Sequence, residues 1–307
     1  MIRMARLLPR FALVLALVVS ASGARAQYRD LEELNWYDWC SVAPVVISAR
    51  TVDADGRFTV VAVDRVLRGP LAPGDSIRID IRNANRERGS QADALRLDPA
   101  KTYLFLLQET TRKRPEDPAT FVLVRDVSGV RELPAEGAEA TLSALEVLVA
   151  IQGLADYGMT WKRFQELLED VNPILVETVL QQYVKFDRAD AETLPAVEPL
   201  LDHPRAAVRR LASAAAGAGL ADARRRGLAG VDTRSVEQAL MARARGDGTT
   251  DVRVAATRAL AGVPGDEITA VLEEIARDDP EQEVRYEAER ALWGRRPGAI
   301  DRRARGS

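Results

Sequence analysis

The stretch HPRAAVRRLASAA, residues 203–215, decides the fold because two later stretches repeat its pattern. These are TTDVRVAATRALA at residues 249–261 and EQEVRYEAERALW at residues 281–293. Each copy has an arginine directly after a shared valine, an alanine four and seven positions after it, and an alanine or leucine eight positions after it. These offsets mark one face of an α-helix, where small residues let a neighbouring helix approach closely. The shared valines are Val208, Val252 and Val284.

Three copies of one helical pattern indicate a stack, because a single helix pair cannot bury its own apolar face. The aligned valines are 44 and then 32 residues apart, which leaves room for a second, shorter helix in each copy. The helical period begins near Gly137, where Leu142, Leu145 and Val149 share one face. We therefore predict an α-solenoid over residues 135–296 and a tail over residues 297–307.

These copies resemble the HEAT-repeat family. The resemblance rests on LLDHPRAAVRRLA, DVRVAATRAL and DDPEQEVRYEAERAL, and DVNPILVETVL looks like a degenerate earlier copy. It implies a HEAT-type α-solenoid of about four helix pairs whose second helices line a concave face. In that family the aspartate and arginine of the motif bond between repeats. The resemblance therefore implies structural roles for Asp202, Arg209, Arg253, Asp278 and Arg285.

Residues 43–134 show a different period. Five segments alternate with period two or are rich in β-branched residues, which predicts strands. The turn sequences DADG at Asp53 and GPLAPGD at Gly69 separate the first three. Five closely connected strands favour a small antiparallel barrel or sandwich. The segments are PVVISARTV, RFTVVAVDRVL, SIRIDIRNA, TYLFLL and TFVLVRDV.

Two of these strand regions, VDRVLRGPLAPGDSIRI and LDPAKTYLFLL, resemble the netrin-like OB barrel shared with tissue inhibitors of metalloproteinases. The resemblance implies an OB-like barrel. Those inhibitors chelate zinc through a cysteine at the mature N-terminus, where this chain would present Gln27. The later cysteines of that family are absent as well, so this inhibitory mechanism does not carry over.

The first 26 residues have the three parts of an export signal. Arginines precede the apolar run FALVLALVV, and the A-x-A sequence Ala24–Ala26 follows. Nine apolar residues are too few to span a bilayer, which needs roughly 20. We therefore predict a signal peptide over residues 1–26, a lead segment over residues 27–42, no membrane span, and a periplasmic or secreted protein. Loss of four arginines changes the formal net charge from −3 to −7, which argues against a nucleic-acid partner.

Residues that could support catalysis are few. His203 is the single histidine and Cys40 the single cysteine, and no G-x-S-x-G, P-loop or G-x-G-x-x-G motif occurs. His203 fits a helix cap better than a metal ligand, and the basic run Arg224–Arg226 fits a solvated loop. Acid pairs such as Glu273–Glu274 are common on solvated helices. We therefore predict no catalytic residue, no metal site and no cofactor.

The strongest candidate for partner binding is the outward strip of the last second helix. Offsets two, six and nine from the repeat valine point away from the core face. Tyrosine, arginine and tryptophan are enriched at binding hot spots. A cap over the end of the stack is the alternative role for this strip. The last copy holds Tyr286, Arg290 and Trp293 there, and the middle copy holds Val254, Arg258 and Ala261. The candidate site is Arg258, Tyr286, Arg290 and Trp293.

A second aromatic group, Trp36, Tyr37 and Trp39, lies in the lead segment, where we expect packing onto the barrel. Together the patterns favour an exported protein that binds a protein partner without catalysis. One alternative is an inhibitor or sensor of an envelope enzyme that acts through the barrel. Another is a hydrolase that uses Cys40 or an acid pair. A binder should keep its partner in a fragment from Gly137 onward, whereas an inhibitor should need the barrel alone. A hydrolase should lose activity on a single Cys40 or glutamate change while still binding.

Overall fold

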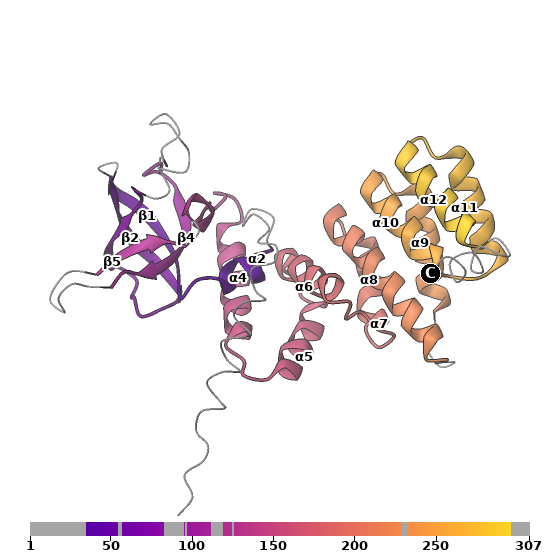
Figure 1. Ribbon diagram of the computed structural model, residues 1–307, viewed down its shortest axis with the longest axis horizontal. Coiled ribbons are helices and arrows are strands. Elements are labelled where there is room, and N and C mark those ends of the chain that lie inside the picture. The colour runs from indigo at the N-terminus through magenta and orange to yellow at the C-terminus, as the bar shows by residue number, and fades with distance from the viewer. Residues whose placement is uncertain are drawn as a thin grey trace, which may run out of the picture. The chain divides into compact units, whose positions relative to one another are not determined.

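The computed structural model describes residues 35–54, 57–82, 95, 97–111, 119–124, 126–228 and 233–295 (Figure 1). The predicted signal peptide at residues 1–26, the first part of the lead segment and the tail at residues 297–307 lie outside this part. The chain divides into two compact units. One contains Val42–Glu132, and the other combines Asn35–Ser41 with the residues from Leu133 onward.

The first unit is a closed β-barrel of five strands with a sixth short strand. Hydrogen bonding follows the order β1-β2-β3-β5-β4, and a β1–β4 pairing closes the ring. The sixth strand pairs with β4. A 3-10 turn, η4 (Asp126–Gly129), precedes it. The strands are β1 (Val45–Ala54), β2 (Phe58–Arg68), β3 (Ser76–Asp80), β4 (Thr102–Glu109), β5 (Thr120–Leu123) and β6 (Val130–Glu132).

The barrel is not wholly antiparallel, because β3 and β5 run parallel. The expectation of an antiparallel barrel is wrong at this pair, for a geometric reason. Neighbouring strands in a closed ring of five cannot all alternate in direction, so at least one pair must be parallel. Inward residues from every strand of the ring fill the core, among them Ile47, Val61, Ile79, Phe105 and Phe121.

The second unit consists of helices that pack in pairs. The second helix of each pair lies beside the second helix of the next pair, so that α6, α8, α10 and α12 form one row. The first helices α9 and α11 pack against this row, and the α7–η5 segment packs against α8. The main helices are α4 (Ala138–Gln152), α5 (Tyr157–Leu167), α6 (Pro173–Lys185), α7 (Leu194–Val197), η5 (Glu198–Asp202), α8 (Ala206–Arg225), α9 (Arg234–Gly246), α10 (Thr250–Ala261), α11 (Asp266–Asp278) and α12 (Gln282–Arg295).

The repeat valines lie at the centre of this row. Val208, Val252 and Val284 are fully buried, as are the alanines four positions later. These alanines are Ala212, Ala256 and Ala288. The face predicted from the three copies is therefore the packed face, and this prediction is confirmed. No described helix combines the length and the apolar character that a membrane span requires.

The aromatic lead segment forms α2 (Trp36–Ser41), which belongs to the helical unit. Trp39 is fully buried, and the ring of Tyr37 lies 5.2 Å from that of Phe164 on α5. Lys185 Nζ at the end of α6 donates to Asp38 at 2.9 Å. The expectation that these aromatic residues pack onto the barrel is therefore corrected, because the contacts described for α2 are with helices.

Candidate functional site

A ladder of arginine–aspartate pairs connects successive repeats. Arg209 on α8 donates from Nε and Nη2 to Asp247 at 2.7 and 2.9 Å. Arg253 on α10 donates in the same way to Asp279 at 2.9 and 3.2 Å. Both aspartates stand five residues before a repeat valine. Each arginine therefore binds the aspartate of the following repeat, and these contacts support the structural roles expected for Arg209 and Arg253.

The arginines also bind backbone within their own repeats. Nη1 of Arg209 donates to the carbonyl of His203 at 2.9 Å, and Nη1 of Arg253 donates to that of Asp247 at 2.8 Å. Arg285, in the last copy, donates to the carbonyl of Asp279 at 2.6 Å. One side chain thus joins the turn before its own helix to the turn of the next repeat.

The aspartates of the ladder are not the two that the sequence predicted. Asp278 has a 57% exposed side chain and pairs with its neighbour Arg277. Asp202 has a 71% exposed side chain and pairs with Arg243 at 3.1 Å. In the doublet Asp278–Asp279 the second residue is the buried one, because its position five before the valine faces the arginine of the previous repeat. The distance from the valine, rather than the acidic doublet, is the signal that identifies it.

His203 takes the aspartate position in the first copy. Its Nδ1 accepts from the backbone N–H of Arg205 at 3.1 Å, as Asp247 Oδ1 accepts from that of Thr249 at 2.9 Å. The previous second helix, α6, has Val176 rather than arginine after its buried Leu175. An anion at position 203 would therefore have no ladder arginine to bind. The N-cap of α8 is Arg205, so His203 bonds the backbone of the turn before the helix and is not itself the cap residue.

Electrostatics hold the Arg209–Asp247 pair in its charged form. Burial alone would raise the pKa of Asp247, but hydrogen bonds from Arg209 and from the Thr249 N–H outweigh it and lower the pKa. The hydrogen bond to Asp247 in turn raises the pKa of Arg209. Asp247 is therefore an ionised structural carboxylate rather than a proton donor.

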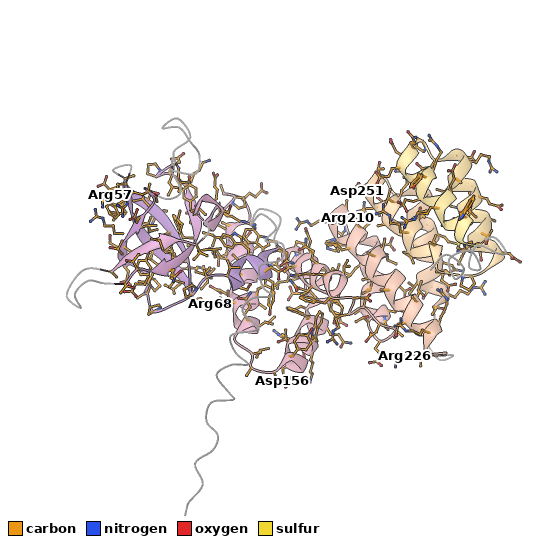
Figure 2. The ribbon with its side chains drawn as sticks, viewed as in Figure 1. Arg57, Arg68, Asp156, Arg210, Arg226 and Asp251 are labelled. Atoms are coloured by element: carbon orange, nitrogen blue, oxygen red, sulfur yellow. The ribbon has the colours of Figure 1, made fainter. Side chains whose placement is uncertain are left out.

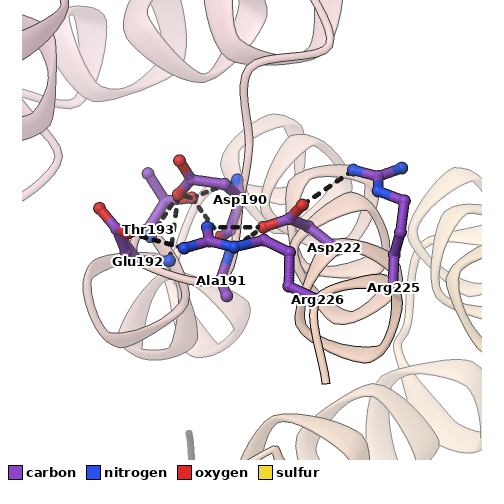
Figure 3. Close-up of polar contacts among 7 residues, drawn as sticks. All are labelled: Asp190, Ala191, Glu192, Thr193, Asp222, Arg225 and Arg226. Carbon is purple, nitrogen blue, oxygen red and sulfur yellow. Dashed lines mark hydrogen bonds and ion pairs between the residues drawn. The ribbon is translucent and has the colours of Figure 1, made fainter. Parts of the chain in front are cut away.

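Another buried carboxylate, Asp222 near the end of α8, binds the segment before α7 (Figure 3). It accepts from the Ala191 N–H at 3.2 Å, from Arg225 at 2.8 Å and from Arg226 at 3.2 Å. These partners lower the pKa of Asp222, the Ala191 N–H most strongly. The remaining arginine of the run, Arg224, pairs with Glu237 at 3.0 Å. The run expected to be a solvated loop therefore makes structural ion pairs.

A groove of about 660 Å³ runs along α8 and α10 to the first turn of α12. Arg210 and Val254 line it at offset two from their valines, and Arg258 lines it at offset six. Asp251, at the start of α10, shares this groove with Arg210 (Figure 2). Neither of these two residues has an ion pair within the described part of the chain. The floor consists of small residues, among them Ala214, Gly217 and Ala259.

Two of the four predicted partner-binding residues meet at one carboxylate. Arg258 on α10 donates to Glu287 on α12 at 2.7 Å, and Arg290 lies 3.7 Å from the other oxygen of Glu287. Glu287 itself is buried. The hydrogen bond from Arg258 is the largest influence on it and lowers its pKa. Arg258 thus combines an inter-repeat bond with a place in the groove wall.

The two aromatic candidates lie on the exposed side of α12. Tyr286 is 61% exposed and Trp293 is 63% exposed. They occupy offsets two and nine, the positions that Arg210 and Gly217 occupy in the groove lining on α8. In the middle copy Val254, expected to point outward, is only 4% exposed because it lies in the groove wall between α8 and α12. The expectation of an exposed Val254 is corrected.

The residues considered for catalysis have ordinary surroundings. Cys40 is fully buried in α2. Glu274 pairs with Arg245 at 2.9 Å, and both side chains are exposed. Within the described part of the chain, no three histidine, cysteine, aspartate or glutamate side chains gather as a metal site would require.

Comparison with known families agrees with the repeat pattern. Residues 225–293, from the end of α8 to α12, match the family model for HEAT repeats. No curated protein and no solved structure shows a significant match to the chain. The similarity to HEAT repeats therefore covers residues 225–293 of the helical unit.

Proposed function

We propose that this protein is an exported, non-enzymatic scaffold that binds a protein partner on the second-helix surface of its HEAT repeats. The observation that carries the proposal is that offsets two, six and nine recur on one surface. All three offsets line the groove on α8, and offsets two and six line it on α10. On α12 the same offsets are Tyr286, Arg290 and Trp293, and both aromatic side chains are exposed. Repeat stacks use such extended surfaces for recognition.

The exposed aromatic residues are the expected anchors. A tyrosine or tryptophan that becomes buried on binding contributes about 2 kcal/mol or more at a hot spot. Two rings spaced two helical turns apart on α12, with Arg290 between them, form one strip. The alternative role, a cap over the end of the stack, accounts less well for side chains that stay more than half exposed.

The decisive experiment is the double variant Tyr286→Ala with Trp293→Ala in the full chain. We expect at least a 30-fold loss of partner affinity, since about 1.4 kcal/mol corresponds to tenfold. The melting temperature should change little, because both side chains are exposed. Partner recovery by cross-linking from the native envelope, together with calorimetry, measures both quantities.

Tyr157→Ala is the matched control, because Tyr157 is a similarly exposed tyrosine on α5 of the same unit. It should leave the affinity unchanged. A double variant that melts earlier but still binds its partner would favour the cap and contradict the proposed surface.

We also propose that the barrel is OB-like. Its closed five-strand ring, in which β1 pairs with both β2 and β4, supports this assignment. An inhibitor or sensor that acts through the barrel is the second candidate function. In that case the double variant on α12 would leave activity toward the envelope enzyme unchanged, whereas changes on the barrel surface would remove it.

A further inference from the structure

A cleft of about 460 Å³ lies between α4 and α5 in the helical unit. Each side contributes residues at the spacing i, i+3, i+4 and i+7, which places them on one face of a helix. The cleft is therefore formed where two helical faces meet. Its lining residues are Val147, Ala150, Ile151 and Leu154 from α4 and the turn that follows it, and Met159, Lys162, Arg163 and Glu166 from α5.

The opposite side of α5 is already packed inside the helical unit. The ring of Trp161 lies 5.1 Å from that of Tyr183 on α6, and Phe164 is buried. At the start of α5, Asp156 caps the helix by accepting from the Met159 N–H at 2.8 Å (Figure 2). These contacts fix the rotation of α5 about its axis, so the helix cannot turn its other face into the cleft without losing them.

The wall of the cleft is aliphatic and partly open to solvent. Met159 is 57% exposed, whereas Ile151 is buried at the base of α4. Val147 and Leu154 are partly buried. No aromatic side chain lines the cleft, so it offers no ring on which a base or a sugar could stack. Methionine is flexible and adapts to irregular apolar shapes. This lining favours a flexible aliphatic chain as the occupant.

Lys162 supplies the one uncompensated charge of the cleft. It has no hydrogen bond, ion pair or ring contact with any residue that the structure describes. The other two charged lining residues neutralise each other, because Arg163 Nη1 donates to Glu166 Oε2 at 2.6 Å. A single positive charge therefore stands beside an aliphatic surface.

We propose that this cleft binds a monoanionic amphiphile of the fatty-acid type. The aliphatic chain lies against Ile151, Leu154 and Met159. The carboxylate pairs with the ammonium group of Lys162. The volume falls within the range of about 300 to 1,000 Å³ that small-molecule sites occupy.

The same lining disfavours more polar ligands. A sugar or a nucleotide would place several polar groups against aliphatic side chains, where each one without a hydrogen-bond partner is costly. One ammonium group can compensate one anionic end only. None of the lining residues belongs to the second-helix surface proposed above, so the two proposals stand or fall separately.

Isothermal titration calorimetry on the full chain tests the cleft at constant ionic strength. The probes are octanoate, decanoate and dodecanoate below their micelle concentrations, together with 1-decanol as an uncharged chain. We expect the carboxylates to bind, with the affinity rising about two- to fourfold for each added CH₂ group. Lys162→Gln should weaken decanoate binding about threefold or more and leave the binding of 1-decanol unchanged.

Met159→Gln tests the apolar wall, because it replaces the exposed thioether by a polar group of similar length. It should weaken the binding of all four probes about fivefold. Val171→Gln is the matched control, because Val171 is a 98% exposed apolar residue between α5 and α6 outside the cleft. Lys101→Gln is the control for charge, because Lys101 is an exposed barrel lysine that pairs with Glu132 at 2.8 Å. Both controls should bind like the wild type.

Ala150→Trp provides a second route if Met159→Gln does not fold. Ala150 is exposed on α4, and an indole there would fill the cleft from the other helix and abolish binding. Three results would overturn the proposal. The wild type could bind none of the carboxylates. Lys162→Gln could bind decanoate as tightly as the wild type. Val171→Gln could weaken binding as much as Met159→Gln, which would show general adsorption to apolar side chains.

Discussion

At the scale of single residues, Gly217 shows how closely α8 and α10 pack. A Cβ atom at this position would lie 2.8 Å from the Cβ of Ala259 and 2.9 Å from its Cα. Neither contact can be relieved by a flexible side chain, because the Cα atom belongs to the backbone and the Cβ atom of alanine is fixed to it. Small residues are therefore required at this crossing of the two helices.

We predict that Gly217→Ala lowers the free energy of unfolding by about 1 to 2 kcal/mol, because overpacking outweighs the better helix propensity of alanine. Gly246→Ala, at the end of α9, is the control, because nothing lies within 4 Å of a Cβ there. It should be neutral or slightly stabilising. Urea denaturation of both variants measures the difference, and equal stabilisation would show that α8 and α10 lie farther apart.

Asp247 is the residue at which the stability of the ladder depends on pH. Its pKa is lowered in the folded chain, so the ionised carboxylate stabilises the fold above its unfolded pKa of about 3.9. That contribution is lost as the pH falls through the lower, folded pKa. Asp247→Asn should cost about 3 kcal/mol at neutral pH, because it leaves Arg209 without its buried partner. Below pH 5 its stability should fall less steeply than that of the wild type.

Asp202→Asn is the control, because it removes an exposed carboxylate rather than the buried carboxylate that pairs with Arg209. Asp202 pairs with Arg243 at the surface, and such pairs contribute about 1 kcal/mol or less. Thermal denaturation across a pH series measures both variants. If Asp202→Asn proves as costly as Asp247→Asn, the assignment of the ladder to the position five residues before the valine is wrong.

At the scale of elements, side-chain periodicity correctly predicted the features that are determined within a single helix or strand. The buried valines, the second helices and the five ring strands follow from side-chain spacing alone. Features that depend on two segments were missed or misplaced. The parallel β3–β5 pair results from closing an odd ring, and β6 is too short to show a period. The contact of Arg78 on β3 with the ring of Phe58 on β2 likewise depends on the β2–β3 register.

The candidate site divides in the same way. Offsets within one helix correctly placed Tyr286 and Trp293 on an exposed face. The contact of Arg258 with Glu287 depends on how α10 and α12 pack, which no single-segment pattern contains. The choice between Asp278 and Asp279 also depends on the neighbouring repeat. Sequence periodicity therefore predicts which face of a helix is exposed. The packing of neighbouring helices determines which side chains on that face form ion pairs within the protein.

Val252→Asp tests the packed face at this scale. Val252 is fully buried in the middle repeat, so an unpaired carboxylate there costs several kcal/mol. We expect the helical circular dichroism to be lost at a lower temperature than in the wild type. Asp251→Asn, at the neighbouring groove position, should melt like the wild type. An unchanged melting curve for Val252→Asp would contradict the alignment of the three copies.

At the scale of the whole molecule, the proposed export signal predicts which residue begins the mature chain. The three-part pattern of residues 1–26 predicts cleavage after Ala26. Mass spectrometry of protein from the native host should show a chain that begins at Gln27. A full-length product in the cytoplasm would contradict export, and with it the periplasmic or secreted location that we propose.

Helix α2 belongs to a different unit from the strands that follow it in sequence. This helix precedes the barrel in sequence, yet its contacts with α4, α5 and α6 make it part of the helical unit. A fragment that starts at Gly137 therefore lacks part of the core that the intact protein has. Loss of partner binding by that fragment would be ambiguous, so single changes in the full chain are the better test.

Trp39→Ala tests whether α2 is part of the core of the helical unit. Truncation of a fully buried tryptophan costs about 3 to 5 kcal/mol. We expect hydrogen exchange to accelerate in peptides from α4 and α6, although position 39 is separated from them by the entire barrel in sequence. Trp293→Ala, on the exposed side of α12, should leave exchange in α4 and α6 unchanged. If Trp39→Ala instead loosens the β2–β3 peptides and leaves α4 protected, α2 belongs to the barrel, and a fragment from Gly137 onward would be a complete helical unit.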